Sequence, residues 1–280
     1  MSELHSLIPP LLTLCHEAGE AICRHYNAPG ADQYQSKGDE SPLTRADLDS
    51  HDILSHGLHQ LDPQLPILSE ESSEQELRGR LNWGRFWMVD PLDGTKEFLA
   101  RTGEFTINIA LIDNNKPVLG VLYLPLEQAA YAGIPGEGAF LYQYQHDWQS
   151  TALKARSLPE GEPLILHASR RHMGPRLSAC LDWLATHWGP IERRNSGSAL
   201  KFCELAKGEG DLYPRYSPCC EWDTAAGQAL LEAAGGALLG LDGKPLRYNC
   251  HESLYSPSFY ALADPGQDLW QQLLASGIGR

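Results

Sequence analysis

The sequence predicts an α/β protein (α+β in its detail) with two lobes, an antiparallel-sheet lobe followed by a mixed-sheet lobe. Three observations carry this prediction. Two amphipathic helical segments open the chain, strand pairs joined by turns follow, and strands then alternate with helices to the end. Such alternation favours a parallel or mixed sheet. A polar stretch with proline and glycine at 155–163 separates the patterns, so we expect lobes at 1–155 and 156–280.

The composition excludes several classes of protein. The chain has 280 residues, 42% of them hydrophobic, and a formal net charge of −14. Its field repels polyanions, which argues against a nucleic-acid polymer as partner. No run approaches the roughly 18–20 apolar residues of a membrane span, and the N-terminus lacks the basic start of a signal peptide. We therefore expect no integral membrane segment and a cytoplasmic location.

Two helices should cover one face of a sheet. Apolar residues recur at helical spacing near the N-terminus, and Pro9-Pro10 predicts a regular helix over 10–26. Thr44 and Asp47 form a variant capping box that opens a second helix. Each helix has one apolar face, so both should pack on a sheet.

An antiparallel meander should follow these helices. A buried strand at 86–89 is expected to stop at Asp90-Pro91, because proline cannot donate to the ladder. The segments 105–112 and 117–124 read as a hairpin, continued by further strands at 129–132 and 138–143.

The second lobe should alternate strands and helices. We expect them in this order: strand 164–167, helix 174–187, strand 190–194, helix 198–207, strand 211–213, helix 224–234, strands 237–240 and 258–263, and helix 267–275.

The most informative segment is 90–95 (Asp-Pro-Leu-Asp-Gly-Thr), where a buried strand ends. Its two carboxylates can aim at one point, and the Leu92 carbonyl between them adds an oxygen, a donor set that suits Mg²⁺. Gly94 and Thr95 would open the next turn with free N–H groups, which can cradle a phosphate. Asp-Gly is also a common turn, so the segment alone leaves both interpretations open.

Two other segments carry acids at comparable places. Glu70 and Glu71 follow the apolar run 65–68, and Asp223 precedes a small-residue helix. Each has a plain alternative, a solvated charge pair for the first and a helix N-cap for the second. Strand ends and helix N-termini gather functional groups in α/β proteins, so these acids could converge with those of 90–95.

Taken together, these motifs resemble the inositol monophosphatase superfamily of metal-dependent, lithium-sensitive phosphatases. The residues that carry the resemblance are Glu70-Glu71, Asp90-Pro91-Leu92-Asp93-Gly94-Thr95 and Trp222-Asp223-Thr224-Ala225-Ala226. Other segments look like its CysQ-type 3'(2'),5'-bisphosphate nucleotidase branch, namely 93–98, 103–112, 200–203 and 212–215. The resemblance spans residues 36 to 260 and implies a five-layer α/β/α/β/α sandwich.

The resemblance also implies a metal site with two or three Mg²⁺ ions. Its ligands would be Glu70, Asp90, the Leu92 carbonyl, Asp93 and Asp223. A phosphate dianion and a carboxylate cluster repel each other, so cations are obligatory, and two ions can activate a water and stabilise the leaving oxygen.

Three residues are candidates for the chemical step. Glu70 can accept a proton from the attacking water, and the Thr95 hydroxyl can direct that water. Asp47 would polarise Thr95, as the corresponding acid does in the family. Capping of its own helix is the alternative role of Asp47.

A bisphosphate substrate keeps one phosphate, which calls for fixed positive charge. Ser198 and Lys201 lie at a strand-to-helix junction that offers N–H groups, a hydroxyl and an ammonium. Arg215 could add a bidentate fork, and His172 is a weaker candidate, since a lone His or Arg is more often a surface residue. The rest of the expected substrate contacts come from the metal site: Glu70, Leu92, Asp93, Gly94, Thr95 and Asp223.

We therefore expect a phosphatase that converts adenosine 3',5'-bisphosphate to AMP and phosphate. The resemblance implies that it also accepts 3'-phosphoadenylyl sulfate, which would link it to sulfate assimilation. An inositol monophosphatase or sugar-bisphosphate phosphatase is the alternative enzyme, and a non-catalytic metal- or nucleotide-binding module is the alternative of another class. Some relatives lie on the cytoplasmic face of the inner membrane, although no basic amphipathic helix here indicates it.

Overall fold

The computed structural model describes residues 3–28, 34–36, 42–158, 160–170 and 174–279. Its elements in chain order are α1 (Glu3–Asn27), β1 (Gln35–Ser36), β2 (Pro42–Leu43), α2 (Arg45–Leu61), β3 (Ile67–Ser69), the 3₁₀ turn η1 (Arg80–Asn82), β4 (Arg85–Asp93), α3 (Thr95–Leu99), β5 (Thr106–Asp113), β6 (Lys116–Leu124), β7 (Ala129–Ile134), β8 (Gly138–Tyr144), β9 (Trp148–Leu153), β10 (Leu164–Ala168), α4 (Pro175–His187), β11 (Ile191–Asn195), α5 (Leu200–Ala206), β12 (Leu212–Arg215), the 3₁₀ turn η2 (Glu221–Asp223), α6 (Ala225–Ala233), β13 (Ala237–Gly240), β14 (Phe259–Leu262) and α7 (Asp268–Ala275).

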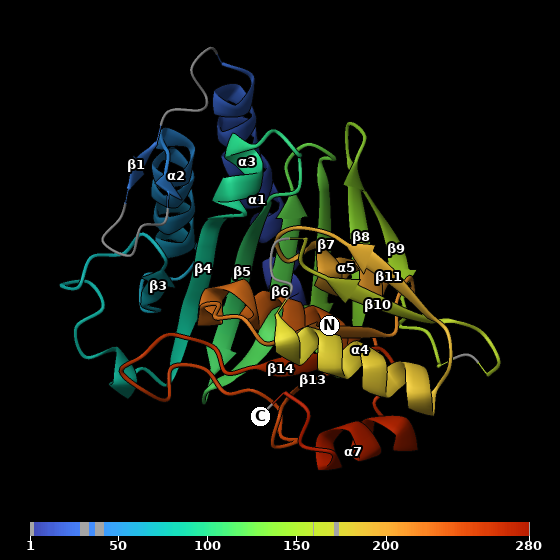
Figure 1. Ribbon diagram of the computed structural model, residues 1–280. Helices are drawn as coiled ribbons and strands as arrows, with labels where there is room; N and C mark the ends of the chain where they lie inside the picture. Colours follow the sequence, from blue (N-terminus) through green and yellow to red (C-terminus); the bar gives the residue numbers. More distant parts are fainter. Residues whose placement is uncertain (1–2, 29–33, 37–41, 159, 171–173, 280) are drawn as a thin grey trace.

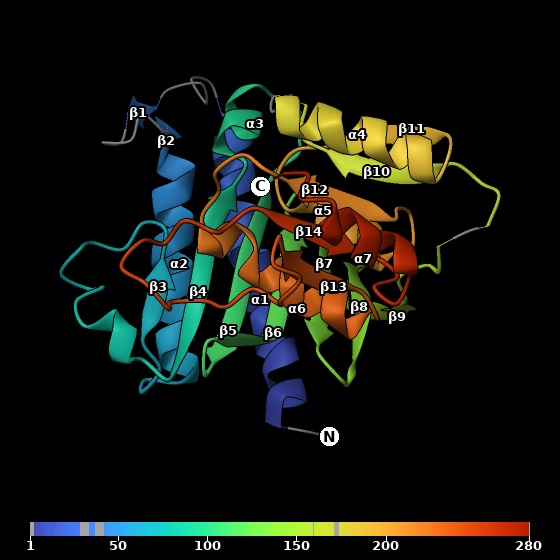
Figure 2. The ribbon, with the colours of Figure 1, turned by 60° about the horizontal axis from the view of Figure 1, so that its bottom comes forward.

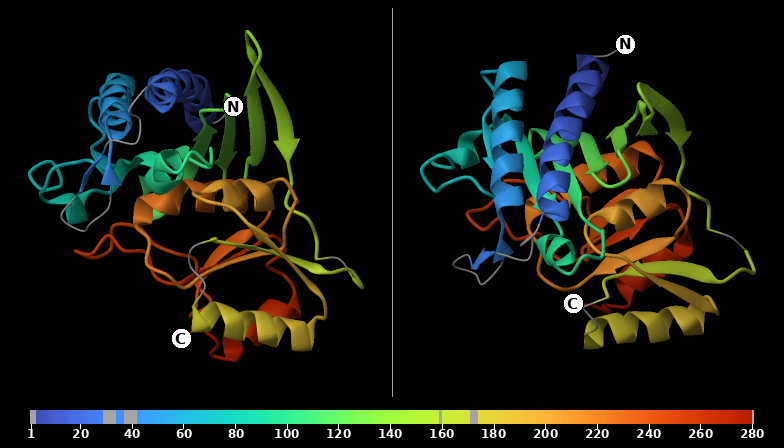
Figure 3. Two further views of the ribbon diagram at one scale, coloured as in Figure 1. Left: turned by 45° about the horizontal axis from the view of Figure 1, so that its top comes forward. Right: turned by 90° about the horizontal axis from the view of Figure 1, so that it is seen from above.

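These elements form five layers, as the resemblance implies (Figure 1; Figure 3, left). Helices α1 and α2 cover one face of a seven-stranded sheet, α5 and α6 lie between that sheet and a five-stranded sheet, and α4 and α7 cover the outer face of the latter. Three apolar clusters fill the four interfaces, the largest of them around α5 and α6.

The seven-stranded sheet runs in chain order from β3 to β9 (Figure 2). The short strand β3 pairs in parallel with β4, and the other neighbours are antiparallel. The expected β5–β6 hairpin is confirmed, and its turn residues Asn114 and Asn115 both have positive φ, a conformation that asparagine tolerates. Strand β9 was not predicted, because its mostly exposed residues lack a clear apolar alternation.

The five-stranded sheet is mixed, with the order β11-β10-β12-β14-β13. Strand β10 pairs in parallel with β11 and β12, whereas β14 is antiparallel to both of its neighbours. All the elements expected after residue 163 are present, with bounds that differ by at most a few residues.

The first helix is longer than the sequence predicts. It begins at Glu3 and contains Pro9 and Pro10, so the expected start at residue 10 is wrong. The prolines remove two N–H donors from the helix ladder. The fully or almost fully buried side chains of Ile8 and Leu11 offset that loss by packing on the sheet.

Strand β4 continues through Pro91, so the expected stop at Asp90-Pro91 is wrong. Asp90 pairs with Asn108 of β5 and Asp93 pairs with Thr106, so three steps on β4 face two steps on β5. This extra residue is a β-bulge, which accommodates the missing proline donor. Residues three apart in a regular strand point to opposite faces. The bulge lets both aspartates reach one side.

Helix α6 lies close to the seven-stranded sheet because two of its strands present glycine. A Cβ on Gly120 would lie 2.3 Å from the carbonyl oxygen of Ala226, and one on Gly133 would lie 2.7 Å from Cα of Leu230. Larger residues would push the helix away. This approach fixes the position of Asp223, just before α6.

Candidate active site

Three acids from two distant parts of the chain meet at the end of β4. Asp90 and Asp93 come from the bulge of that strand, and Asp223 comes from η2. One carboxylate oxygen of each lies within 4.8 Å of the others. The expected convergence of these three residues is therefore a feature of the structure.

Glu70 lies beside this cluster. It follows β3, and its backbone N–H donates to the Val89 carbonyl at 3.0 Å, which continues the parallel pairing with β4. The Glu70 residue thus sits next to Asp90 across the two strands. Its charge helps to raise the pKa of both Asp90 and Asp223.

Burial and the neighbouring acids raise the pKa of Asp90 and of Asp223. Burial, followed by the charges of Glu70, Asp93 and Asp223, raises the pKa of Asp90 well above its usual range. Burial and the charges of Asp93 and Glu70 raise the pKa of Asp223 to about 8. Carboxylates this close are stable in ionised form only when positive charge lies between them. The donor set fits a divalent cation.

A turn from the other sheet orients Asp93. The Ser198 hydroxyl and the Ala199 N–H both donate to Oδ2 of Asp93 at 2.7 Å, and the amide of Asn108 approaches the same oxygen at 3.3 Å. Outer partners of this kind fix the direction of a metal-binding carboxylate. All three donors use Oδ2, so Oδ1 of Asp93 can serve as a metal ligand.

Thr95 opens α3 directly beside the acids. Its hydroxyl lies 3.2 Å from Oδ1 of Asp47 and 3.3 Å from the Leu92 carbonyl. Gly94 precedes it with φ 93°, and a Cβ there would lie 2.8 Å from the Glu104 carbonyl, so the position requires glycine.

The basic residues expected to bind substrate lie next to the cluster. Nζ of Lys201 donates to the carbonyls of Ser196 and Ser198, at 3.1 and 2.6 Å. Burial, followed by the charge of Arg215, lowers the pKa of Lys201 to about 8. The Arg215 guanidinium donates to the carbonyls of Ser217 and Pro218 and to the Tyr213 hydroxyl.

Two cavities adjoin at Arg215. The smaller, of about 110 Å³, is lined by Asp93, Asp223, Ser198, Lys201 and Arg215 among others. The larger, of about 590 Å³, is more apolar and is lined by residues of α4, by the 213–217 segment and again by Arg215. Ser169 and Tyr213 also line both.

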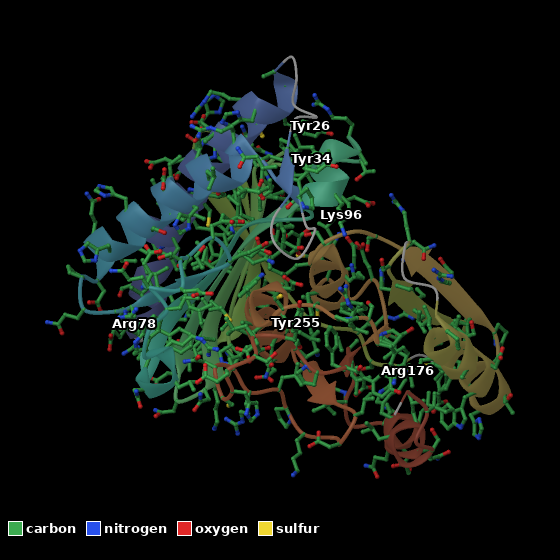
Figure 4. The ribbon with its side chains drawn as sticks, turned by 60° about the vertical axis from the view of Figure 1, so that its left-hand side comes forward. Tyr26, Tyr34, Arg78, Lys96, Arg176 and Tyr255 are labelled. Atoms are coloured by element: carbon green, nitrogen blue, oxygen red, sulfur yellow. The ribbon has the colours of Figure 1, made fainter. Side chains whose placement is uncertain are left out.

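The sequence prediction missed some of the lining and one candidate cannot be placed. Lys96 lines the smaller cavity and Arg176 the larger one, and both are labelled in Figure 4. Lys96 follows Thr95 in the informative segment, so its place in the sequence could have indicated it. His172 lies outside the residues that the structure describes.

The sequence profile of the inositol monophosphatase family matches residues 3–276. This chain belongs to that family. Its acid cluster lies between the two sheets, and the range of residues that the family profile matches includes every acid of the cluster.

Within the family, the chain is similar to proteins that are named as nucleotidases. The chain is 39% identical over 255 residues to "3'(2'),5'-bisphosphate nucleotidase CysQ" of Escherichia coli (strain K12), a match that covers 90% of this chain and 98% of the relative. It is 35% identical over 262 residues to the protein of the same name from Buchnera aphidicola, which covers 92% and 94%.

The fold is also similar to those of solved structures from the inositol monophosphatase family. The crystal structure of CysQ from Bacteroides thetaiotaomicron, a bacterial member of the inositol monophosphatase family, superposes with a TM-score of 0.79 at 36% identity and covers 93% of this chain and 98% of its own. An inositol monophosphatase from Zymomonas mobilis, at 22% identity and a TM-score of 0.76, covers 99% of both chains and shares the fold. Among the described residues, no helix combines the length and apolar character needed to cross a membrane.

Proposed function

We propose that this protein is a Mg²⁺-dependent phosphatase that converts adenosine 3',5'-bisphosphate to AMP and phosphate. The observation that carries the proposal is the position of Arg215, which lines both the cavity of the acid cluster and the larger apolar cavity. A substrate with two phosphates and a planar base needs a cation-binding site for one phosphate, a cationic side chain for the other phosphate and an apolar surface for the base, in that order. The nucleotidase relatives support the same assignment.

The cluster provides the oxygen ligands for the cations. Glu70, Asp90, Asp93, Asp223 and the Leu92 carbonyl would hold two or three Mg²⁺ ions. When bound, the ions neutralise the phosphate, lower the pKa of a water and stabilise the leaving oxygen.

The protein's own groups direct the proton and the attacking water. The Thr95 hydroxyl donates toward Asp47 or the Leu92 carbonyl, so its lone pairs can accept a hydrogen bond from the water and fix its direction. Glu70, which lies beside Asp90, would accept the proton from that water. Asp47 holds Thr95 rather than touching the substrate.

Recognition of the nucleotide would come from the second sheet. Arg215, Lys201 and the Ser198 hydroxyl lie beside the acids, where the retained phosphate would bind. Tyr213 and Tyr216 line the larger cavity, and the ring of Tyr216, which is only partly buried, would suit a purine face. We retain His172 as a weaker candidate contact.

A substrate panel tests the assignment. We expect phosphate release from adenosine 3',5'-bisphosphate to exceed release from inositol 1-phosphate, with strict dependence on Mg²⁺. Lys201→Ala should reduce both rates, because Nζ also holds the turn at Ser198, and it should reduce the rate with the bisphosphate more than the rate with inositol phosphate. Equal or better activity on inositol phosphate would favour the inositol or sugar-bisphosphate alternative. Mg²⁺ binding without any turnover would favour the non-catalytic module.

We propose that the enzyme also accepts 3'-phosphoadenylyl sulfate, which would place it in sulfate assimilation. We also propose that it acts in the cytoplasm, and cell fractionation tests whether it associates with the inner membrane face.

We propose a lobe boundary near residue 155, between β9 and β10. Limited proteolysis should cut the chain there first.

A further inference from the structure

Glu104 is an acidic residue outside the metal cluster that contacts two segments of the second sheet's lobe. One oxygen of its carboxylate, Oε2, accepts a hydrogen bond from the Gly197 N–H at 3.1 Å. The other, Oε1, lies 2.5 Å from the Arg170 guanidinium. The Glu104 side chain is 18% exposed and that of Arg170 is 51% exposed. One carboxylate therefore bridges the segment after β10 and the turn before α5.

The turn that Glu104 holds is the one that orients Asp93. Gly197 directly precedes Ser198 and Ala199, the two donors to Oδ2 of Asp93. Ser198 has φ 49°, in the left-handed region that a residue with a side chain rarely occupies. Such a conformation persists only where surrounding contacts hold it. Nζ of Lys201 supplies two of these contacts on the carbonyl side.

Glu104 supplies the contact on the N–H side, and the packing there is close. A Cβ on Gly197 would lie 2.7 Å from Cγ of Glu97 and 3.2 Å from Cβ of Glu104. A larger residue at this position would displace the side chain of Glu97 or Glu104. The fit leaves the turn little freedom to shift unless the carboxylate moves.

Glu104 does not share the cavity of the acids. It lines a separate cavity of about 420 Å³, together with Ser196, Glu127 and others, and is absent from the lining of the cavity that contains Asp93. A direct contact with substrate phosphate is therefore not its role. It acts through the turn.

We infer that Glu104 is a positioning residue for the metal site. By holding Gly197 it keeps Ser198 and Ala199 aimed at Asp93, so that Asp93 presents its second oxygen to the cation. By holding Arg170 it also fixes the position of the neighbouring Ser169, which lines both cavities. This inference rests on the proposed metal-dependent phosphatase.

Metal titration of matched variants tests the inference. Glu104→Ala removes both contacts, Glu104→Gln keeps one acceptor for the Gly197 N–H, and Arg170→Gln removes only the ion pair. Glu127→Gln is the control, because Glu127 lines the same cavity as Glu104. Mg²⁺ and Mn²⁺ affinity would be measured by calorimetry, without substrate, beside thermal unfolding in chelator.

We expect Glu104→Ala to weaken metal binding about tenfold, at the low end for residues that orient metal ligands. Glu104→Gln and Arg170→Gln should stay within about threefold of the unaltered protein, since the Gly197 contact survives in both. The Glu127→Gln control should not change. In turnover assays, Glu104→Ala should require more Mg²⁺ for half-maximal rate, with a smaller change in kcat at saturating Mg²⁺.

Unaltered metal affinity in a folded Glu104→Ala protein would overturn the inference. So would an equal loss in Glu104→Ala and Glu104→Gln accompanied by equal destabilisation, because that pattern indicates a purely structural role. Should Glu104→Ala fail to fold, Glu104→Asp, whose shorter side chain cannot reach both partners, should give an intermediate metal affinity, and unchanged affinity would count against the inference. If the protein hydrolysed only inositol phosphate, the nucleotide assignment would be wrong, but the metal titration would still test whether Glu104 positions the metal site.

Discussion

Asp47 binds Thr95 with one carboxylate oxygen while it caps its own helix with the other. Oδ1 lies 3.2 Å from the Thr95 hydroxyl, and Oδ2 accepts from the N–H and the hydroxyl of Thr44, at 2.7 and 2.5 Å. The capping box is complete and Asp47 is buried. One side chain therefore makes both of the contacts that the two alternative roles call for. Helix α2 is locked to the start of α3.

Removal of the Thr95 hydroxyl should slow turnover with little effect on folding. We expect Thr95→Val to lower kcat about 100-fold, at the low end for a group that assists proton transfer or water orientation. Thr95→Ser keeps the hydroxyl and should retain most of the rate. Steady-state kinetics at saturating Mg²⁺ measure both, and equal rates for Val and Ser variants would show that the hydroxyl has no part in the reaction.

Asp47→Asn separates the two functions of Asp47. The amide oxygen can still accept from Thr44, so the cap should lose only about 1 kcal/mol or less. The charge that orients Thr95 is lost, and we expect kcat to fall well below that of the unaltered enzyme. Denaturant unfolding and kinetics on the same preparation test this. A large stability loss with normal kcat would mean that Asp47 serves the helix alone.

Asp93→Asn should uncouple metal binding from folding. Asparagine can still accept from Ser198 and Ala199, while the loss of one negative charge relieves repulsion with Asp90 and Asp223. In chelator the variant should be at least as stable as the unaltered protein. Mg²⁺ at 100 times its Kd should stabilise the unaltered protein by about 2.7 kcal/mol and the variant far less.

Thermal unfolding with and without Mg²⁺ measures that difference, and phosphate release should be almost abolished in the variant. Asp242→Asn, at an exposed turn, is the control. Normal turnover by Asp93→Asn would contradict the metal assignment.

Glu221 should make stability depend on pH in an unusual direction. Its side chain is buried and accepts the Asn249 N–H at 2.6 Å, and burial raises its pKa from 4.5 to about 7. Between these values the unfolded chain loses the proton and the folded chain keeps it. The contribution of Glu221 to the free energy of unfolding is therefore greatest below pH 4.5 and falls as the pH rises to about 7.

Glu221→Gln removes that dependence. Across this window the stability of the unaltered protein relative to the variant should fall by an amount on the order of 1–3 kcal/mol. Urea unfolding in chelator at several pH values measures it. A difference between the two proteins that does not vary with pH would contradict the raised pKa.

Li⁺ should inhibit the phosphatase at millimolar concentration, as the family resemblance implies. The reason is that Li⁺ is a small hard cation that can occupy an oxygen-ligand site with half the charge of Mg²⁺. Rates measured in LiCl and in equal NaCl separate this effect from ionic strength. Equal rates in the two salts would weaken the assignment.

Much of the fold follows from local sequence patterns. The Thr44–Asp47 capping box, the β5–β6 hairpin and the alternation of strands and helices after residue 163 are each written in a few neighbouring residues. The acidic motifs were likewise visible, because strand ends followed by carboxylates are a local pattern. Strand β9 was not predicted because its mostly exposed residues lack an apolar alternation, and the true start of α1 was not predicted because its first turns are stabilised by packing on a sheet that is distant in the sequence.

The sequence by itself determined which residues can do chemistry here and in what order the elements come. Only the tertiary structure decided how those residues meet. The bulge that turns Asp90 and Asp93 to one side depends on the register with β5, and the hold on Asp93 depends on a turn from the other sheet more than a hundred residues away. Register and layer packing arise from hydrogen bonds and buried surface between segments remote in sequence, so no window of neighbouring residues encodes them.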